Sequence, residues 1–158
     1  MANTQAMCTS FMGELLTATH NFGTAPTRGS STADSFKAAL YESTATINAS
    51  TTAYTVSGEV SGTNYTAGGL AISAWNAPTA TNSSATAGVA FTTPTASFVY
   101  TNVTLTTAFD CVLIYNSTQS NKSVSVHTFG SQTITAGTFT LTMPTNNTTN
   151  ALLRLATT

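Results

Sequence analysis

The sequence has very little charge. Its 158 residues include four Lys or Arg and five Asp or Glu, so that charged residues make up 6% of the chain and the formal net charge is −1. An ordinary globular domain has about 25% charged residues. Binding to a phosphate backbone or to an anionic membrane surface requires clustered positive charge. We therefore expect neither nucleic acid nor a membrane as a partner.

Long apolar runs are missing as well. The longest, such as "CVLIY" at 111–115, fall far short of the roughly 20 residues that span a bilayer. The N-terminus "MANTQAMCTSFMGELL" has no basic residue before its first apolar stretch and no continuous apolar region, so it does not resemble a secretory signal. We expect a protein made and kept in the cytosol, where Cys8 and Cys111 stay free thiols.

Residues that could carry catalysis or bind a metal are few. The histidines are His20 and His127, and no Gly-x-Ser-x-Gly elbow frames a nucleophile. A contact between His127 and Asp110 would be the basis of a small hydrolase, but we favour a strand-face histidine with no reaction to catalyse. The carboxylates are scattered, and the spacings typical of zinc and calcium sites are absent from the sequence. We expect no enzymatic activity, no metal and no cofactor.

Apolar residues, by contrast, make up 41% of the chain, with five Tyr and eight Phe. Disordered chains lack such residues, which are needed to offset the loss of chain entropy on folding. The chain should therefore fold. Its length suits one domain of the commonest size, and we predict a single domain over 1–158.

One segment has the period of a helix. Within residues 5–22, an apolar stripe on one helical face includes Met7, Phe11 and Leu15, which are four residues apart. Gly23 is a candidate C-cap. The stripe must cover something, most simply a sheet. We predict one N-terminal α-helix over about 5–22.

The rest of the chain has the alternation of β-strands. Threonine often occupies every second position, as in "TITAGTFTLT" at 133–142, and a β-branched side chain suits a pleated sheet. "CVLIY" is apolar on both faces and is expected at the centre of a sheet. Short turns between the later segments, "STQSN" and "TAG", predict antiparallel hairpins. The candidate strands are 35–43, 52–60, 70–75, 97–106, 109–116, 122–129, 138–144 and 151–156.

This spacing predicts a mainly β fold. Seven or eight short strands with turn signals are typical of an antiparallel β-sandwich or a jelly-roll-like domain, here over about 35–156, with the N-terminal helix added to it. Residues 24–34 form a turn-rich connector. Residues 76–96 contain two prolines and many small or hydroxyl-bearing side chains, and we predict a long loop or arm there.

Sheet faces without charge are poorly suited to a lone monomer, because charge repulsion and charged edges keep β proteins apart. Such a surface favours permanent assembly with neighbours. The single tryptophan, Trp75, has two interpretations: a core residue, which we favour, or an anchor in an interface with a partner.

Several phrases of the sequence, taken in order and with their spacing, resemble a family of small virion proteins encoded by tailed bacteriophages. The phrases are "AMCTSFMGELL…HNFG", "DSFKAALYES", "TAYTVSGEVSGTNYTAGG", "VLIYNSTQSNKSVSVHTFG" and "TAGTFTLTMPTNNTTNALLRLA". The likeness spans nearly the whole chain and fails mainly over 76–96. It transfers no catalytic residues.

The resemblance implies a virion structural protein. We expect a capsid decoration, or cement, protein that binds the outer shell in many copies and stabilises the head by bridging capsomers. The alternative is a tail or fibre component, which could recognise a host glycan.

The resemblance also implies partners and a location. The partners would be the major capsid protein or other virion proteins, together with copies of the chain itself in a dimer or trimer. The protein would be assembled in the cytoplasm of the host bacterium and end in the virion. The expected contact elements are the N-terminal arm and the 76–96 loop, with Tyr65, Trp75 and Phe91 as interface anchors.

Overall fold

The computed structural model describes residues 3–16, 19–22, 33–81 and 88–156. The chain divides into two compact units, which are treated one at a time. Unit one draws its described residues from Met1–His20, Asp34–Ala71 and Val99–Thr140, and unit two from Asn21–Ala33, Ile72–Phe98 and Leu141–Thr158. The single domain expected from the chain length stays a prediction.

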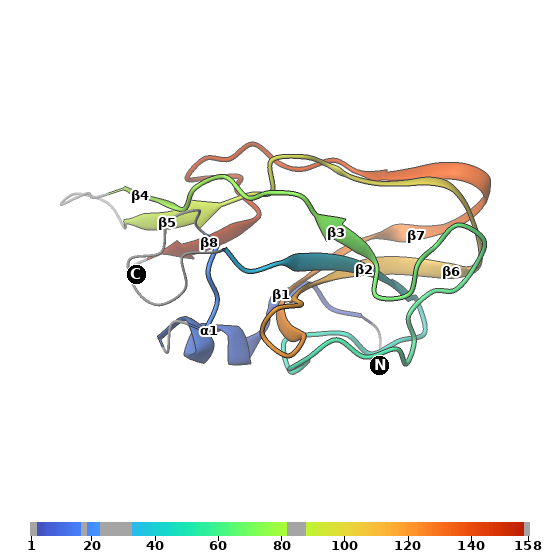
Figure 1. Ribbon diagram of the computed structural model, residues 1–158, viewed down its shortest axis with the longest axis horizontal. Coiled ribbons are helices and arrows are strands. Elements are labelled where there is room, and N and C mark those ends of the chain that lie inside the picture. Colours follow the sequence, from blue (N-terminus) through green and yellow to red (C-terminus); the bar gives the residue numbers. More distant parts are fainter. Residues whose placement is uncertain (1–2, 17–18, 23–32, 82–87, 157–158) are drawn as a thin grey trace. The chain divides into compact units, whose positions relative to one another are not determined.

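The described residues are mainly β-strand, with one short helix among them (Figure 1). The elements are β1 (Ala6–Met7), α1 (Thr9–Leu16), β2 (Phe36–Glu42), β3 (Leu70–Ile72), β4 (Thr79–Thr81), β5 (Val89–Thr92), β6 (Phe98–Asn116), β7 (Lys122–Leu141) and β8 (Leu153–Ala156). One sheet has the strand order β1-β7-β6-β2-β3 and the other the order β4-β5-β8. Strands pair antiparallel in both sheets. The mainly β, antiparallel class predicted from the sequence is confirmed.

The most buried part of unit one is formed by β2 and the second half of β6. Residues 38–41 of β2 and 111–116 of β6 are all buried, and Ala38 lies opposite Ile114 in the register. A strand that is covered on both faces reads as a continuous apolar run. The central position predicted for "CVLIY" is therefore confirmed.

The long strands β6 and β7 fold back on themselves (Figure 1). The Tyr100 hydroxyl donates to the Ala38 carbonyl over 2.7 Å, and Ala38 is the partner of Ile114. A straight strand would place residues 100 and 114 roughly 45 Å apart, so β6 must bend between them. β7 bends too, because the rings of Phe129 and Phe139 lie 5.2 Å apart. The bend encloses aromatic rings between its two arms.

We call residues 109–116 and 122–129 the inner limb of this hairpin, and residues 99–107 and 130–140 its outer limb. The sequence predicted four separate strands here, and that prediction is wrong because the strands run on through the bend. The hairpin turn predicted at "TAG" is also absent. Ala136 instead takes a φ of 47°, and its N–H donates to the Thr104 hydroxyl over 3.0 Å, so the irregularity stays inside β7.

The N-terminal helix is shorter than the predicted span of about 5–22. The residues before α1 pair with β7 as β1. The Thr19 N–H closes the other end of the helix on the Glu14 carbonyl over 2.9 Å, a bond typical of helix C-termini. The predicted cap at Gly23 and most of the 24–34 connector lie outside the described residues.

Residues 52–60 do not form the predicted strand. They make isolated bridges, from Ala53 to Lys122 and from Glu59 to Tyr41. The chain turns at Gly58, whose φ of 78° favours glycine. The strand predicted over 70–75 is likewise reduced to β3.

In unit two, part of the predicted 76–96 loop is regular structure. β4 and β5 pair antiparallel, with Ala80 opposite Ala90, and β5 pairs in turn with β8. The loop prediction is therefore wrong for these two strands, while residues 82–87 lie outside the described part of the chain. β8 confirms the strand predicted over 151–156.

Candidate functional site

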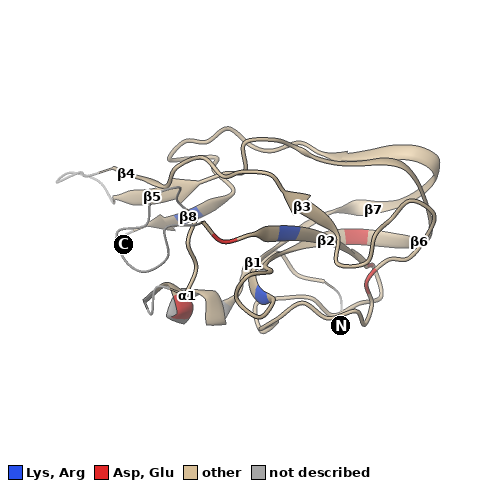
Figure 2. Ribbon diagram, in the orientation of Figure 1, with Lys and Arg blue, Asp and Glu red and all other residues tan. Residues whose placement is uncertain are grey.

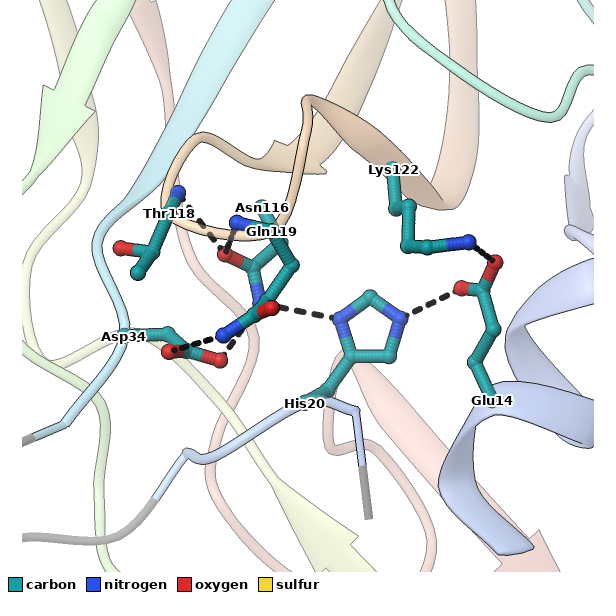
Figure 3. A network of polar contacts seen from close by, with 7 residues as sticks. All are labelled: Glu14, His20, Asp34, Asn116, Thr118, Gln119 and Lys122. Carbon is teal, nitrogen blue, oxygen red and sulfur yellow. Dashed lines mark hydrogen bonds and ion pairs between the residues drawn. The ribbon is translucent and has the colours of Figure 1, made fainter. Parts of the chain in front are cut away.

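A network of polar side chains surrounds His20 in unit one (Figure 3). We call it the His20 network; its members are Glu14, His20, Asp34, Asn116, Thr118, Gln119 and Lys122. Glu14 belongs to α1, Asn116 ends β6 and Lys122 begins β7. The network therefore ties the helix to the β6–β7 turn.

Asn116 is the centre of this network and is fully buried. Its side-chain oxygen accepts the backbone N–H groups of Thr118 (3.0 Å) and Gln119 (3.1 Å). Its amide nitrogen, which carries two hydrogens, lies 2.7 Å from Asp34 Oδ2 and 3.0 Å from His20 Nδ1. All four hydrogen-bonding positions of the amide are thus used, and the amide orientation is fixed.

The fixed amide decides how His20 is bonded. Asn116 Nδ2 can only donate, so His20 Nδ1 accepts and carries no proton in this arrangement. The proton of the neutral ring is then on Nε2, which lies 2.6 Å from Glu14 Oε2. The side chain of His20 has 0% of its area exposed, and its ring packs edge-on against Phe11 at a centroid distance of 4.9 Å.

Glu14 joins the histidine to a lysine. Its second oxygen accepts from Lys122 Nζ over 2.6 Å. Burial alone would raise the pKa of the Glu14 carboxyl, but the hydrogen bonds from Lys122 and His20 outweigh this effect and lower the pKa below its usual value. Glu14 is therefore ionised at neutral pH.

A carboxylate–imidazole pair can activate a nucleophile when the far ring nitrogen faces it. In the His20 network that nitrogen faces the Asn116 amide, and the ring is closed off from solvent. What this arrangement does chemically is hold three chain segments together.

A second polar cluster surrounds Glu59. Its carboxylate accepts from the hydroxyls of Tyr54 (2.6 Å) and Tyr65 (2.8 Å) and from the backbone N–H of Gly68 (2.8 Å). The Tyr65 hydroxyl also accepts from the N–H of Leu40 over 3.0 Å. These bonds hold the irregular segment 52–69 against β2.

The pKa of each of the five tyrosines of the chain is raised above its usual value. Burial is the largest cause for each one, and the negative charge of Glu59 adds to it. The pKa of Tyr115 rises to about 12, and its ring stacks on Tyr54 at a centroid distance of 4.7 Å. The tyrosines are therefore neutral hydrogen-bond donors at physiological pH.

His127 and Asp110, the pair considered for a hydrolase, bond to other groups. His127 Nε2 lies 2.9 Å from Ser125 Oγ, and Asp110 Oδ1 accepts from Asn3 Nδ2 over 2.6 Å. Burial lowers the pKa of His127 to about 4, so the ring is neutral at pH 7. Ser125 is itself 2% exposed.

The three predicted interface anchors fall in different units. Tyr65 belongs to unit one and is half-buried, with its hydroxyl bonded inside the protein. Trp75 and Phe91 belong to unit two. The ring of Trp75 packs edge-on against Phe22 at 4.8 Å, and Phe91 lies on β5 opposite Arg154. Their role as interface anchors stays a prediction.

The sequence predicts free cysteines and no metal site. Cys8 and Cys111 are free and buried, as predicted, and burial raises their pKa values to about 11 and about 12. Within the described residues, no three His, Cys, Asp or Glu side chains are grouped so that they could hold a metal ion. No helix in the described part of the chain is both long and apolar enough to cross a membrane.

In comparisons with known proteins, no family model, curated protein or solved structure matches the chain.

Sequence reasoning missed the residues at the centre of both polar clusters. His20 was weighed only as a catalytic base, and neither Asn116 nor Glu59 was singled out. One signal was present: Asn116 directly follows the apolar run "CVLIY", and a polar residue at the end of a buried strand needs internal partners.

Proposed function

We propose that this chain is a structural protein of a tailed-bacteriophage virion, and specifically a capsid decoration protein that bridges capsomers. The resemblance of its sequence supports the virion, and the distribution of its charges supports permanent assembly. We also propose that the strands pack as a β-sandwich or jelly roll, as the strand pattern predicts. The proposed partners are the major capsid protein and further copies of the chain, in a dimer or trimer.

The observation that carries the proposal is where the few charges lie. Residues 60–109 and 123–153 contain no Lys, Arg, Asp or Glu, and Figure 2 shows long uncharged stretches of the strands. Four of the five carboxylates accept hydrogen bonds from other side chains of unit one: Glu14, Asp34, Glu59 and Asp110. The surface is therefore even poorer in free charge than the composition suggests.

An uncharged β surface suits a protein that is permanently covered. Soluble β proteins use charged side chains to keep their sheets from pairing with one another. A decoration protein needs the opposite, because its copies bury complementary surface at fixed positions on a shell.

Rigidity supports the same proposal. The His20 network fixes the helix to the hairpin, and the Glu59 cluster fixes segment 52–69 to β2. A surface that is already ordered loses little conformational entropy on binding. Each bound copy can then add its binding energy to the stability of the shell.

The test is to add the purified protein to heads of the encoding phage that were assembled without it. We expect saturable binding in cosedimentation, density on the outer shell in cryo-electron microscopy, and a higher temperature of DNA release. Labelled protein found on the tail alone would contradict capsid decoration and favour the tail or fibre alternative. Absence of binding to any part of the particle would overturn both.

Variants can locate the contact with the shell. We expect Trp75→Ala and Phe91→Ala to weaken binding to the heads about tenfold or more, as substitutions at interface anchors do. Val56→Ala is the control, because Val56 is 72% exposed but was not predicted as an anchor. Equal binding by all three variants would show that Trp75 and Phe91 do not anchor the interface.

A further inference from the structure

One edge of the five-stranded sheet is open. β7 has β6 on one side and β1 on the other, but β1 pairs only with Ser125 and Val126. The N-terminal segment also donates the Cys8 N–H to the Val124 carbonyl over 3.1 Å and accepts from the Thr128 hydroxyl at Gln5 over 3.4 Å. Over the residues that the structure describes, no other strand or isolated bridge joins this side of β7 from 129 to 140.

Neighbouring strands of the same sheet have backbone partners from the irregular segment 52–69. On β6, the Thr104 N–H donates to the Thr63 carbonyl over 3.1 Å. A Cβ atom on Gly62 would lie only 1.9 Å from the Thr104 carbonyl oxygen, so the covering segment approaches β6 as closely as backbone allows. On β2, the Leu40 carbonyl accepts from the Val60 N–H over 3.1 Å. Within the described residues, β7 from 129 to 140 lacks the backbone partners that these stretches of β6 and β2 have.

The sheet face beside this edge is open at Gly130, and the edge has none of the usual protection. A Cβ atom on Gly130 would meet no other atom within 4 Å. The exposed residues here are Gly130, Ser131, Gln132, Thr133, Thr135, Ala136, Thr138 and Thr140. Residues 129–141 include no charge and no proline, the two features with which natural proteins block strand edges. Figure 2 shows this part of β7 without charged residues.

We propose that Ser131–Thr135 of β7 pairs antiparallel with the same segment of a second copy of the chain, around a two-fold axis. The proposal deepens the function proposed above, because it names the surface that joins the copies. It also explains why the edge carries no charge: in a symmetric pair every charged side chain would face its own copy or a close neighbour of it, and like charges across a strand pair are destabilising.

The sequence of the segment fits symmetric pairing. With Thr133 on the axis, Ser131 lies opposite Thr135 and Gln132 opposite Ile134 of the second copy. Hydroxyl side chains then face hydroxyl side chains along one side of the joined sheet, a favourable cross-strand combination. The irregularity at Ala136, with its positive φ, ends the regular edge and limits the paired segment to these residues.

The first test is the mass of the purified protein in solution, without any phage particle. We expect sedimentation equilibrium to show a dimer. Ser131→Lys, Thr133→Lys and Thr135→Lys together should weaken the dimer at least tenfold, because they place positive charges opposite one another. A matched control is Thr101→Lys, Thr106→Lys and Thr107→Lys together, which adds the same charge to exposed positions of β6 and should leave the dimer intact.

Circular dichroism and thermal unfolding keep this test independent of folding defects. Both triple variants should keep the spectrum of the wild-type protein. A wild-type monomer or trimer would overturn the proposal, and so would a 131/133/135 variant that folds and stays as dimeric as the control.

The second test is a cross-link on the axis. Paired strand residues have Cα atoms about 4.5–5.5 Å apart, within the range that a disulfide spans. Thr133→Cys should therefore form a disulfide-linked dimer on mild oxidation, whereas Thr101→Cys should not. The native thiols, Cys8 and Cys111, are buried and do not compete. Failure of Thr133→Cys to cross-link in a dimeric sample would place the interface elsewhere and overturn the proposal.

These experiments test the pairing of the β7 edge independently of capsid decoration. A protein that dimerises through Ser131–Thr135 but ignores phage heads would disprove capsid decoration and leave the edge pairing standing. A monomer that binds the heads would disprove the edge pairing and leave capsid decoration standing.

Discussion

The inner and outer limbs of the β6–β7 hairpin belong to the same two strands and have opposite environments. In the inner limb, every residue from 111 to 116 is buried, and the polar Asn116 has four hydrogen-bond partners inside the protein. In the outer limb, most residues of β7 are exposed, and five of these exposed residues bear hydroxyls. The difference shows that neighbours, more than strand propensity, decide what each part of a strand does.

The contrast extends to charge. The carboxylates of Glu14 and Asp34 serve the His20 network beside the inner limb, while the outer limb has no charged residue at all. In a folded monomer, the charged side chains normally lie on the surface and the core is neutral. Here three of the scarce charges, Glu14, Asp34 and Lys122, organise contacts within the chain, and the outer limb is neutral.

The largest loss of stability is expected when Asn116 of the inner limb is replaced. Asn116→Ala leaves Asp34, His20 and two backbone N–H groups without their partner in a buried site, so we expect a loss of about 3–5 kcal/mol in the free energy of unfolding. Urea denaturation followed by circular dichroism measures it. Asn150→Ala, at an exposed position, should change stability by less than about 0.5 kcal/mol. Equal losses would show that the inner network contributes no special stability.

A second prediction compares one residue type in the two limbs. Ile114 is fully buried, with 0% of its surface exposed, so Ile114→Ala should cost about 2–5 kcal/mol because it leaves a cavity. Ile134 is only half-buried in the outer limb, and Ile134→Ala should cost about 1 kcal/mol or less. The measurement is urea denaturation at low protein concentration. A larger loss at Ile134 would mean that its limb is packed as tightly as the inner one.

Much of the sheet could be predicted because its signals are local. The run "CVLIY" predicts a strand that is covered on both faces. The short turn after Asn116 predicts a hairpin, and Ser120 and Asn121 in this turn take positive φ values. The strand over 35–43 was also found, as β2. Each of these features depends on residues that are close together in the sequence.

The bend and the two polar clusters could not be predicted, because they join distant residues. His20 and Asn116 are 96 positions apart, and the local sequence around either residue does not predict a contact with the other. Residues 52–60 alternate like a strand, yet Tyr54 and Glu59 bond each other over 2.6 Å instead of facing opposite sides of a sheet. Tertiary contacts overrode local propensity there.

A third prediction concerns pH and the inner network. The pKa of Glu14 is lower in the folded protein than in the unfolded chain, so its ionised form stabilises the fold above the unfolded value of about 4.3. This stabilisation is lost as the pH falls through the lowered folded pKa. We expect Glu14→Gln to cost about 2 kcal/mol at pH 7.

Urea denaturation at several pH values checks the sign of this effect. The difference between wild type and Glu14→Gln should shrink steadily as the pH is lowered from 5 toward 2. Glu42→Gln is the matched control, since it removes a carboxyl outside the His20 network. A difference that stays constant with pH would show that the charge of Glu14 does not stabilise the network.

The smallest effect at neutral pH is expected from the tyrosines, two of which join the limbs to other parts of unit one. Tyr100 of the outer limb bonds the carbonyl of Ala38, and Tyr115 of the inner limb bonds that of Gly68 over 2.7 Å. Because folding raises the pKa of every tyrosine, the contribution to stability is complete below about pH 10, the unfolded value, and is lost as the pH rises above it.

Absorbance at 295 nm, which reports tyrosinate, should therefore stay flat through pH 10 in the folded protein. It should then rise in one step together with the loss of the circular dichroism signal, since the hydroxyls ionise when the chain unfolds. In urea, the same chain should titrate near pH 10. Tyrosinate that appears near pH 10 while the protein is still folded would mean that solvent reaches the buried hydroxyls in the native state, and that burial does not raise their pKa.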